Sequence, residues 1–127
     1  MEKLSGSCPF CGGKTEISRV SCTTCGVHVE GMFELPRLAR LPAESRKLVE
    51  MYLMSNGSMK ELSTRVGLSY RPLRARLDRI ARELKRERAR DEAKRLELLD
   101  KVANGTLSAE AAAVRIEELD LSPYGGD

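Results

Sequence analysis

The strongest constraint on the fold of this chain is a group of four cysteines near its N-terminus. They form two Cys-x-x-Cys pairs, each followed by a glycine: Cys8 with Cys11, and Cys22 with Cys25. Both thiolates of such a pair can reach one ion, and four thiolates make the closed tetrahedral shell that zinc favours. We therefore expect one structural Zn2+ held by all four cysteines, replacing a hydrophobic core that about 30 residues cannot build.

Other uses of these thiols stay open at this stage. Iron could occupy a rubredoxin-like site with the same four ligands, and the thiols could instead be oxidised or form disulfides. His28 follows Cys25 by three residues and could compete as a ligand. Because four cysteines leave no coordination position for water, a catalytic zinc ion is not expected.

The sequence around the cysteine pairs predicts short strands. Ile17 and Val20 partly alternate with polar residues between the pairs, and Val27 and Val29 alternate after them. Two cysteine turns on short strands form a zinc ribbon, which we place at residues 1–33. The fold class expected for the whole chain is mainly α with this small β zinc ribbon.

The chain has a net charge of +3, and its charged residues are distributed unevenly along the sequence. Residues 34–95 hold 17 basic and nine acidic side chains, a net +8, whereas residues 96–127 hold two basic and seven acidic ones, a net −5. This asymmetry indicates a central part that faces a polyanion, with a solvated charged surface as the alternative. No apolar run approaches the roughly 20 residues of a transmembrane helix and no secretory signal is recognisable, so we expect a cytoplasmic protein.

Residues 34–81 have the pattern of a helix-turn-helix domain. A first helix opens at Pro42 and stops at an Asn-Gly pair. Ser58 caps a short second helix that Gly67 terminates, and a third helix begins at Tyr70. The turn of about three residues between the last two helices, with glycine at its start, is the spacing of a helix-turn-helix motif.

The third helix of this domain is the expected recognition helix. One face carries its large apolar residues, Leu73, Leu77, Ile80 and Leu84. Arginine matches guanine bidentately and also binds phosphates, and the N-terminal turns of a recognition helix enter the major groove. The candidate DNA-contacting residues are Lys60, Arg65, Ser69, Tyr70, Arg71, Arg74, Arg76 and Arg79, with Arg71 and Arg74 nearest the bases. The alternative is a three-helix protein-binding bundle with an arginine-rich outer face.

The last third of the chain predicts further helices. Residues 82–95 are expected to form a charged helical connector that continues the third helix, or a basic extension that contacts nucleic acid. Residues 96–121 predict a two-helix hairpin that is too small to bury both of its apolar stripes by itself. We expect this hairpin to make the protein an oligomer, a dimer in the simplest case, through Leu96, Leu99, Val102, Ile116 and Leu119. Residues 122–127 predict a flexible tail.

Several of these segments together resemble a known family. The stretches CPFCGG, CTTCG, GMFELPRLARLP and GLSYRPLRARLD are similar to an uncharacterised bacterial family of zinc-ribbon/helix-turn-helix proteins, a domain of unknown function. The helix-turn-helix of that family is similar to region 4 of bacterial sigma factors. The resemblance implies a transcriptional regulator without a known target. The stretch LLDKVANGTLSAEAA resembles short C-terminal (SHOCT-like) helical hairpins, which implies oligomerisation.

The expected recognition helix departs from the family pattern. The family has Ser-Tyr-Pro-Thr-Val-Arg-Asn-Arg-Leu, whereas this chain has Arg71, Pro72 and Ala75 in place of the proline, the threonine and the asparagine. Two polar side chains able to contact bases are lost and one arginine is gained. The resemblance therefore implies DNA affinity in general and not a particular base preference.

Together these patterns predict a zinc-containing transcriptional regulator that binds double-stranded DNA through its recognition helix. A protein-interaction adaptor is the second hypothesis, with RNA polymerase, a sigma factor or another regulator as its partner. An enzyme is not expected, because the chain has one histidine, no open metal shell, no recognisable nucleophile with its base and no phosphate-binding glycine loop. Neither a membrane nor a small-molecule substrate is expected as a partner.

Overall fold

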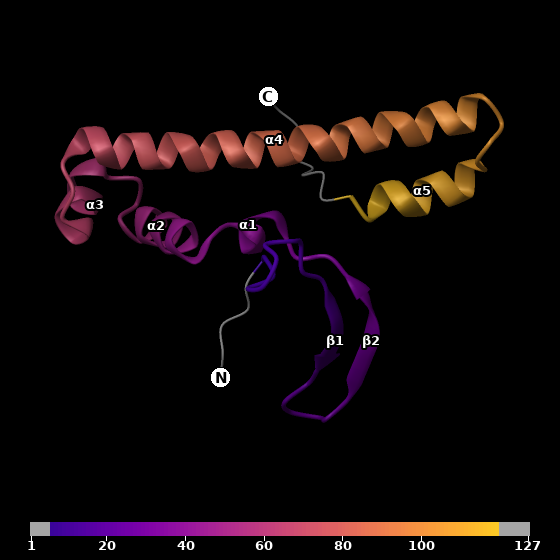
Figure 1. Cartoon of the computed structure of the whole chain (residues 1–127), viewed down its shortest axis with the longest axis horizontal. Helices are drawn as coiled ribbons and strands as arrows, with labels where there is room; N and C mark the ends of the chain where they lie inside the picture. Colours follow the sequence, from indigo (N-terminus) through magenta and orange to yellow (C-terminus); the bar gives the residue numbers. More distant parts are fainter. Residues whose placement is uncertain (1–5, 120–127) are drawn as a thin grey trace. The chain divides into compact units, whose positions relative to one another are not determined.

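The computed structural model describes residues 6–119, which are mostly helical with one small sheet at the N-terminal end (Figure 1). Residues 120–127, with the end of the predicted hairpin and the predicted tail, lie outside this range. The chain divides into two compact units, the first ending at Ile80 and the second beginning at Ala81. Among the described residues no helix combines the length and the apolarity needed to cross a membrane. Helices with a small N-terminal sheet agree with the predicted fold class.

The sheet consists of β1 (Ile17–Ser21) and β2 (His28–Phe33), which pair antiparallel. Val20 pairs with Val29, and the register shifts near the start of β1. Most side chains of the two strands are open to solvent, and these two valines are 49% and 52% exposed. A two-stranded sheet with so little burial is not stable through its own packing alone.

The base of the sheet leads into a single helical turn, α1 (Arg37–Arg40). Gly6 passes so close to this turn that a Cβ atom on it would lie 2.8 Å from the Cα of Arg40. Leu35 and Leu41, which flank the turn, are 5% and 3% exposed. These two leucines therefore belong to the hydrophobic core.

Helices α2 (Ala43–Met54) and α3 (Met59–Val66) contact each other. As predicted, an Asn-Gly pair in the left-handed conformation follows α2, with φ of 51° and 75°. The predicted cap of α3 is confirmed, since the Ser58 hydroxyl accepts a hydrogen bond from the Glu61 N–H at 3.2 Å. Leu62 of α3 is fully buried, with 0% exposure.

The turn into α4 (Tyr70–Ala103) has the predicted helix-turn-helix length. Gly67 ends α3 at φ 73°, in the left-handed region that a residue with a Cβ adopts only with strain. The hydroxyl of Ser63 donates to the carbonyl oxygen of Leu68 and ties the end of α3 to the turn. Leu73, at the start of α4, is 0% exposed, so the predicted apolar face of this helix is the one that packs inward.

α4 is a single helix of 34 residues. It joins the predicted recognition helix, the charged connector and the first helix of the predicted hairpin. At 1.5 Å per residue its length is about 51 Å. The continuity follows from the sequence, because no glycine interrupts residues 70–103 and Pro72 lies in the first turn, where proline is tolerated.

α5 (Ala109–Glu117) follows a short loop and runs opposite in direction to the end of α4 (Figure 1). The N–H of Thr106 donates to the carbonyl oxygen of Lys101 at 2.9 Å, which satisfies one of the free carbonyls at the end of α4. The Ser108 hydroxyl accepts from the Ala111 N–H at 3.2 Å, which confirms the predicted cap of α5.

Leu62→Ala should destabilise the helix-turn-helix, because it removes a fully buried side chain and leaves a cavity. Substitutions of this kind cost about 2–5 kcal/mol. The matched control is Leu53→Ala on α2, where the side chain is 66% exposed and the same change should cost less than about 0.5 kcal/mol. Urea unfolding followed by circular dichroism measures both variants, and equal midpoints would contradict the assigned core.

Candidate metal centre and nucleic-acid interface

Each cysteine pair lies in a tight turn, and the two turns share one backbone pattern. The N–H of the first cysteine, Cys8 or Cys22, donates to the carbonyl oxygen five residues later, at 2.8 Å in both turns. The N–H of the glycine after the pair, Gly12 or Gly26, donates back to the carbonyl of the first cysteine, at 2.9 and 3.0 Å. Both glycines have φ of 73°, a conformation that favours glycine. The repeated glycine of the sequence motif therefore closes each turn.

Backbone N–H groups in these turns point at the first sulfur of each pair. The nitrogen of Phe10 lies 3.4 Å from Cys8 Sγ, and the nitrogen of Cys25 lies 3.5 Å from Cys22 Sγ. Backbone hydrogen bonds, first from the second cysteine of the pair and then from the residue before it, lower the pKa of Cys8 and lower the pKa of Cys22 to about 7. Because the thiolate is the form that binds metal, both turns suit a zinc ion.

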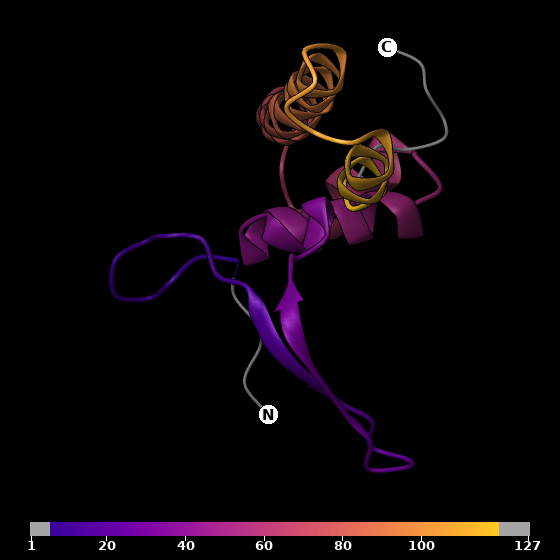
Figure 2. The ribbon, with the colours of Figure 1, turned by 90° about the vertical axis from the view of Figure 1, so that its right-hand side faces the viewer.

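The structure places the two pairs at opposite ends of the sheet. The first pair precedes β1, and the second lies in the loop that joins β1 to β2 (Figure 2). Five extended residues span about 13 Å, whereas each thiolate of a zinc site lies about 2.3 Å from the metal. Within residues 6–119, no three or more His, Cys, Asp or Glu side chains are grouped to hold a metal ion. The structure thus contains two turns suited to metal and does not assemble the predicted four-cysteine site.

His28 has a partner on the neighbouring strand. It lies opposite Ser21 in the strand register, and its Nδ1 atom is 2.8 Å from Ser21 Oγ. The side chain is otherwise exposed. This contact accounts for His28 as an ordinary strand residue.

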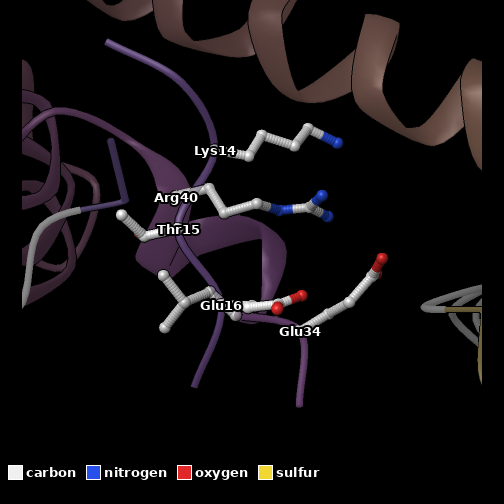
Figure 3. A pocket seen from close by; sticks show the side chains of 6 residues that line it. Lys14, Thr15, Glu16, Glu34 and Arg40 are labelled. Atoms are coloured by element: carbon white, nitrogen blue, oxygen red, sulfur yellow. The ribbon is translucent and has the colours of Figure 1, made fainter. Parts of the chain in front are cut away.

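A small polar pocket lies between the base of the sheet and α1 (Figure 3). Its volume is about 80 Å³, and its charged lining residues are Lys14, Glu16, Glu34 and Arg40. Figure 3 shows the side chains of Lys14 and Arg40 extending in the same direction. The carboxylates of Glu16 and Glu34 balance the charge of these two basic groups. Pockets for small molecules measure about 300–1,000 Å³, so this one is too small for a substrate.

The predicted DNA-contacting residues lie on α3, on the turn and on the first three turns of α4. All eight are exposed: Lys60, Arg65, Ser69, Tyr70, Arg71, Arg74, Arg76 and Arg79. The buried side of α4 in this region carries Leu73 and Ile80, which are 0% and 6% exposed. Packing of these two residues therefore leaves the arginines open to a partner.

Two of these arginines are engaged within their own helices. Arg74 Nε lies 3.3 Å from an oxygen of Asp78, and Arg65 Nη2 lies 2.9 Å from an oxygen of Glu61. All four side chains are roughly half exposed, and ion pairs of this kind contribute only about 0.3–0.5 kcal/mol. A phosphate or a guanine can therefore replace these carboxylates at small cost. Within residues 6–119, Arg71 has no ion pair to replace.

The residues predicted for oligomerisation divide into two groups. Leu96 and Leu99 are 53% and 41% exposed. Val102, Ile116 and Leu119 are half-buried within the chain itself. The two exposed leucines are the part of the set that a partner can reach, and oligomerisation itself stays a prediction.

Comparison with protein families gives two adjacent matches. The family model of the DUF2089 zinc ribbon matches residues 8–39, and the model described as a domain of unknown function (DUF2089)-HTH matches residues 41–87. The chain belongs to the DUF2089 family. No curated protein and no solved structure gave a match.

The two DUF2089 matches fall on the two features described above. The zinc-ribbon match spans both cysteine pairs, which supports zinc binding by these turns. The helix-turn-helix match includes α2, α3 and α4 as far as Glu87, six residues past the end at residue 81 that the sequence suggested. Because the family is of unknown function, membership gives neither a DNA target nor support for RNA polymerase or a sigma factor as a partner.

After zinc is removed with a chelator, Cys22 should react with iodoacetamide at a half-maximal rate at about pH 7, because its lowered pKa provides thiolate above that pH. In strong denaturant the turn is lost, and the midpoint should rise to the ordinary thiol value of about 8.5. Mass spectrometry of the peptide that carries Cys22 measures alkylation across the pH series. Profiles that coincide in native and denatured protein would contradict stabilisation of the thiolate by the turn.

Proposed function

We propose that this DUF2089 protein is a DNA-binding transcriptional regulator, and not an enzyme, whose α4 enters the major groove of duplex DNA. The observation that carries the proposal is the outer face at the start of α4, where Arg71 and Arg74 are exposed while Leu73 between them is fully buried. In helix-turn-helix proteins the N-terminal turns of the second helix contact base edges. The family match to a helix-turn-helix domain supports the same function.

The charge of the central region supports a nucleic acid as the partner. Residues 34–95 carry a net charge of +8 from 17 basic and nine acidic side chains. Arginine can pair with guanine O6 and N7 or bind a phosphate, and lysine can bind a phosphate as well. We assign base contacts to Arg71 and Arg74, and phosphate contacts to Lys60, Arg65, Arg76 and Arg79.

We propose further that both cysteine pairs bind one zinc ion with a structural role. The donor set is four thiols, and a tetrahedral four-thiolate shell has no position left for water. The extended β1 holds the pairs apart, so sharing one ion requires the link between them to bend. The cross-link would stabilise a ribbon whose two strands bury little apolar surface.

Replacing Arg71 and Arg74 together by alanine should weaken duplex binding by about 5-fold to 150-fold per arginine lost, because each bidentate base contact contributes about 1–3 kcal/mol. The preference for a selected sequence over a scrambled one should fall with it. Fluorescence anisotropy with a labelled duplex, taken from a selection on a random library, measures both quantities.

The matched control is Arg90→Ala with Arg95→Ala, which removes two arginines from another part of α4. Both side chains pair within the helix, Arg90 with Glu87 at 3.7 Å and Arg95 with Glu92 at 2.7 Å. The control should bind nearly as the wild type does. Equal affinities of the two variants would contradict recognition through the start of α4, and salt-independent binding by the wild type would contradict DNA binding itself.

Elemental analysis of the purified protein should give about one zinc ion per chain, as a four-thiolate site requires. Cys22→Ser should lower this ratio, and Ser18→Ala on β1 should leave it unchanged. Chelation should speed hydrogen exchange in β1 and β2, which the metal cross-link would stabilise, and should leave the local hydrogen bonds of each cysteine turn in place. It should also spare α2 and α3, because those helices have their own buried leucines. A ratio of about two or about one half would sink the single site within one chain.

A further inference from the structure

The basic face of α4 continues beyond the helix-turn-helix. Arg82, Lys85 and Arg86 follow Arg71 by eleven, fourteen and fifteen residues. At 3.6 residues per turn these spacings are close to three and four complete turns, so all three side chains share the side of α4 that carries Arg71 and Arg74. All three are exposed.

These three side chains are not neutralised by the helix itself. Further along α4 a basic residue commonly has an acidic partner one turn away, as Lys101 has in Glu97 at 2.8 Å. Between residues 6 and 119, no ion pair involves Arg82, Lys85 or Arg86. Their charge is therefore available to an external anion.

The face between Arg71 and Arg86 is also nearly free of competing acids. Asp78 is the one acidic residue on this side of α4, and its carboxylate is paired with Arg74 at 3.3 Å. A surface with this balance of charge attracts a polyanion over its whole length and not only at its start.

The length of α4 indicates which part of a bound DNA duplex Arg82, Lys85 and Arg86 would contact. From Arg71 to Arg86 the helix rises about 23 Å, whereas the major groove is about 12 Å wide. When residues 70–78 occupy the groove, the next turns of the helix extend over its edge, where the sugar-phosphate backbone runs. A basic helix face at that place meets phosphates, which position a protein without specifying sequence.

The family match also extends beyond the first turns of α4. The helix-turn-helix match ends at residue 87 and so includes Arg82, Lys85 and Arg86. Within residues 6–119, the ion pairs along α4 other than Arg74 with Asp78 lie between Glu87 and Lys101, at or beyond that limit.

We propose that Arg82, Lys85 and Arg86 form a phosphate-contacting extension of the recognition helix, which grips the DNA backbone beside the groove. The proposal rests on the proposed function, since it concerns the same complex. The extension adds affinity and salt dependence and adds no base preference.

The test is the salt dependence of duplex binding by the full, zinc-loaded chain. Changing Arg82, Lys85 and Arg86 to alanine should lower the slope of log K against log salt concentration by about 2.7, at 0.9 per phosphate contact. At about 0.1 M salt the affinity should fall on the order of 100-fold. The ratio of affinities for a selected and a scrambled duplex should stay as in the wild type.

The matched control is Lys94→Ala, Arg95→Ala and Lys101→Ala, which removes three charges from other faces of α4. Its slope should change by less than about one phosphate contact, 0.9. Arg82→Lys with Arg86→Lys keeps the charge and should keep the slope. Alanine favours helix, so circular dichroism should show equal helix content in all variants.

Three outcomes would overturn an assignment. An unchanged slope in the triple-alanine variant would overturn the extension and leave this face to an acidic protein surface. A loss of sequence preference in that variant would also overturn it, because the residues would then contact bases. A wild-type chain that binds no duplex would instead overturn the proposed function itself.

Discussion

Burial of Leu62 and Leu73 is the constraint on which the rest of the structure depends. Both side chains are fully excluded from solvent, one on α3 and one at the start of α4. A helix that turns one stripe inward must turn the opposite stripe outward, so the position of Leu73 determines that Arg71 and Arg74 face a partner. The residues that stabilise the fold are therefore also those that determine which side of α4 is exposed.

The N-terminal ribbon is stabilised by other means. Its turns are shaped by backbone hydrogen bonds and by two glycines in the left-handed conformation, and its strands remain largely exposed. Close packing holds the ribbon only where it meets α1. There Leu35 is buried and the backbone at Gly6 lies close to Arg40. A metal cross-link would suit such a segment, because it can stabilise the fold without buried apolar area.

Short sequence patterns predicted much of the local structure. How distant segments pack against one another could not be predicted as well. The caps at Ser58 and Ser108 and the helix-turn-helix turn were predicted correctly, because each depends on a few neighbouring residues. The burial of Leu35 and Leu41 was missed, since periodicity gives the face of a segment and not what lies against it. For the same reason the spacing of the cysteines predicted two turns but not their placement at the two ends of the sheet. DNA contact and oligomerisation remain predictions from sequence, charge and exposure.

From Ala81 onward α4 is one continuous helix, which fixes the angle about its axis between the basic residues Arg82 and Arg86 and the exposed leucines Leu96 and Leu99. Each residue of a helix turns the next by about 100°, so one residue inserted between Arg86 and Leu96 would rotate the exposed leucines by that angle relative to Arg82. An insertion of seven residues would restore the phase to within about 20°. The number of residues in the connector therefore sets the angle about the helix axis between the two groups as well as the distance between them. Any partner that binds the exposed leucines also fixes, through this part of the helix, the direction in which Arg82 and Arg86 point.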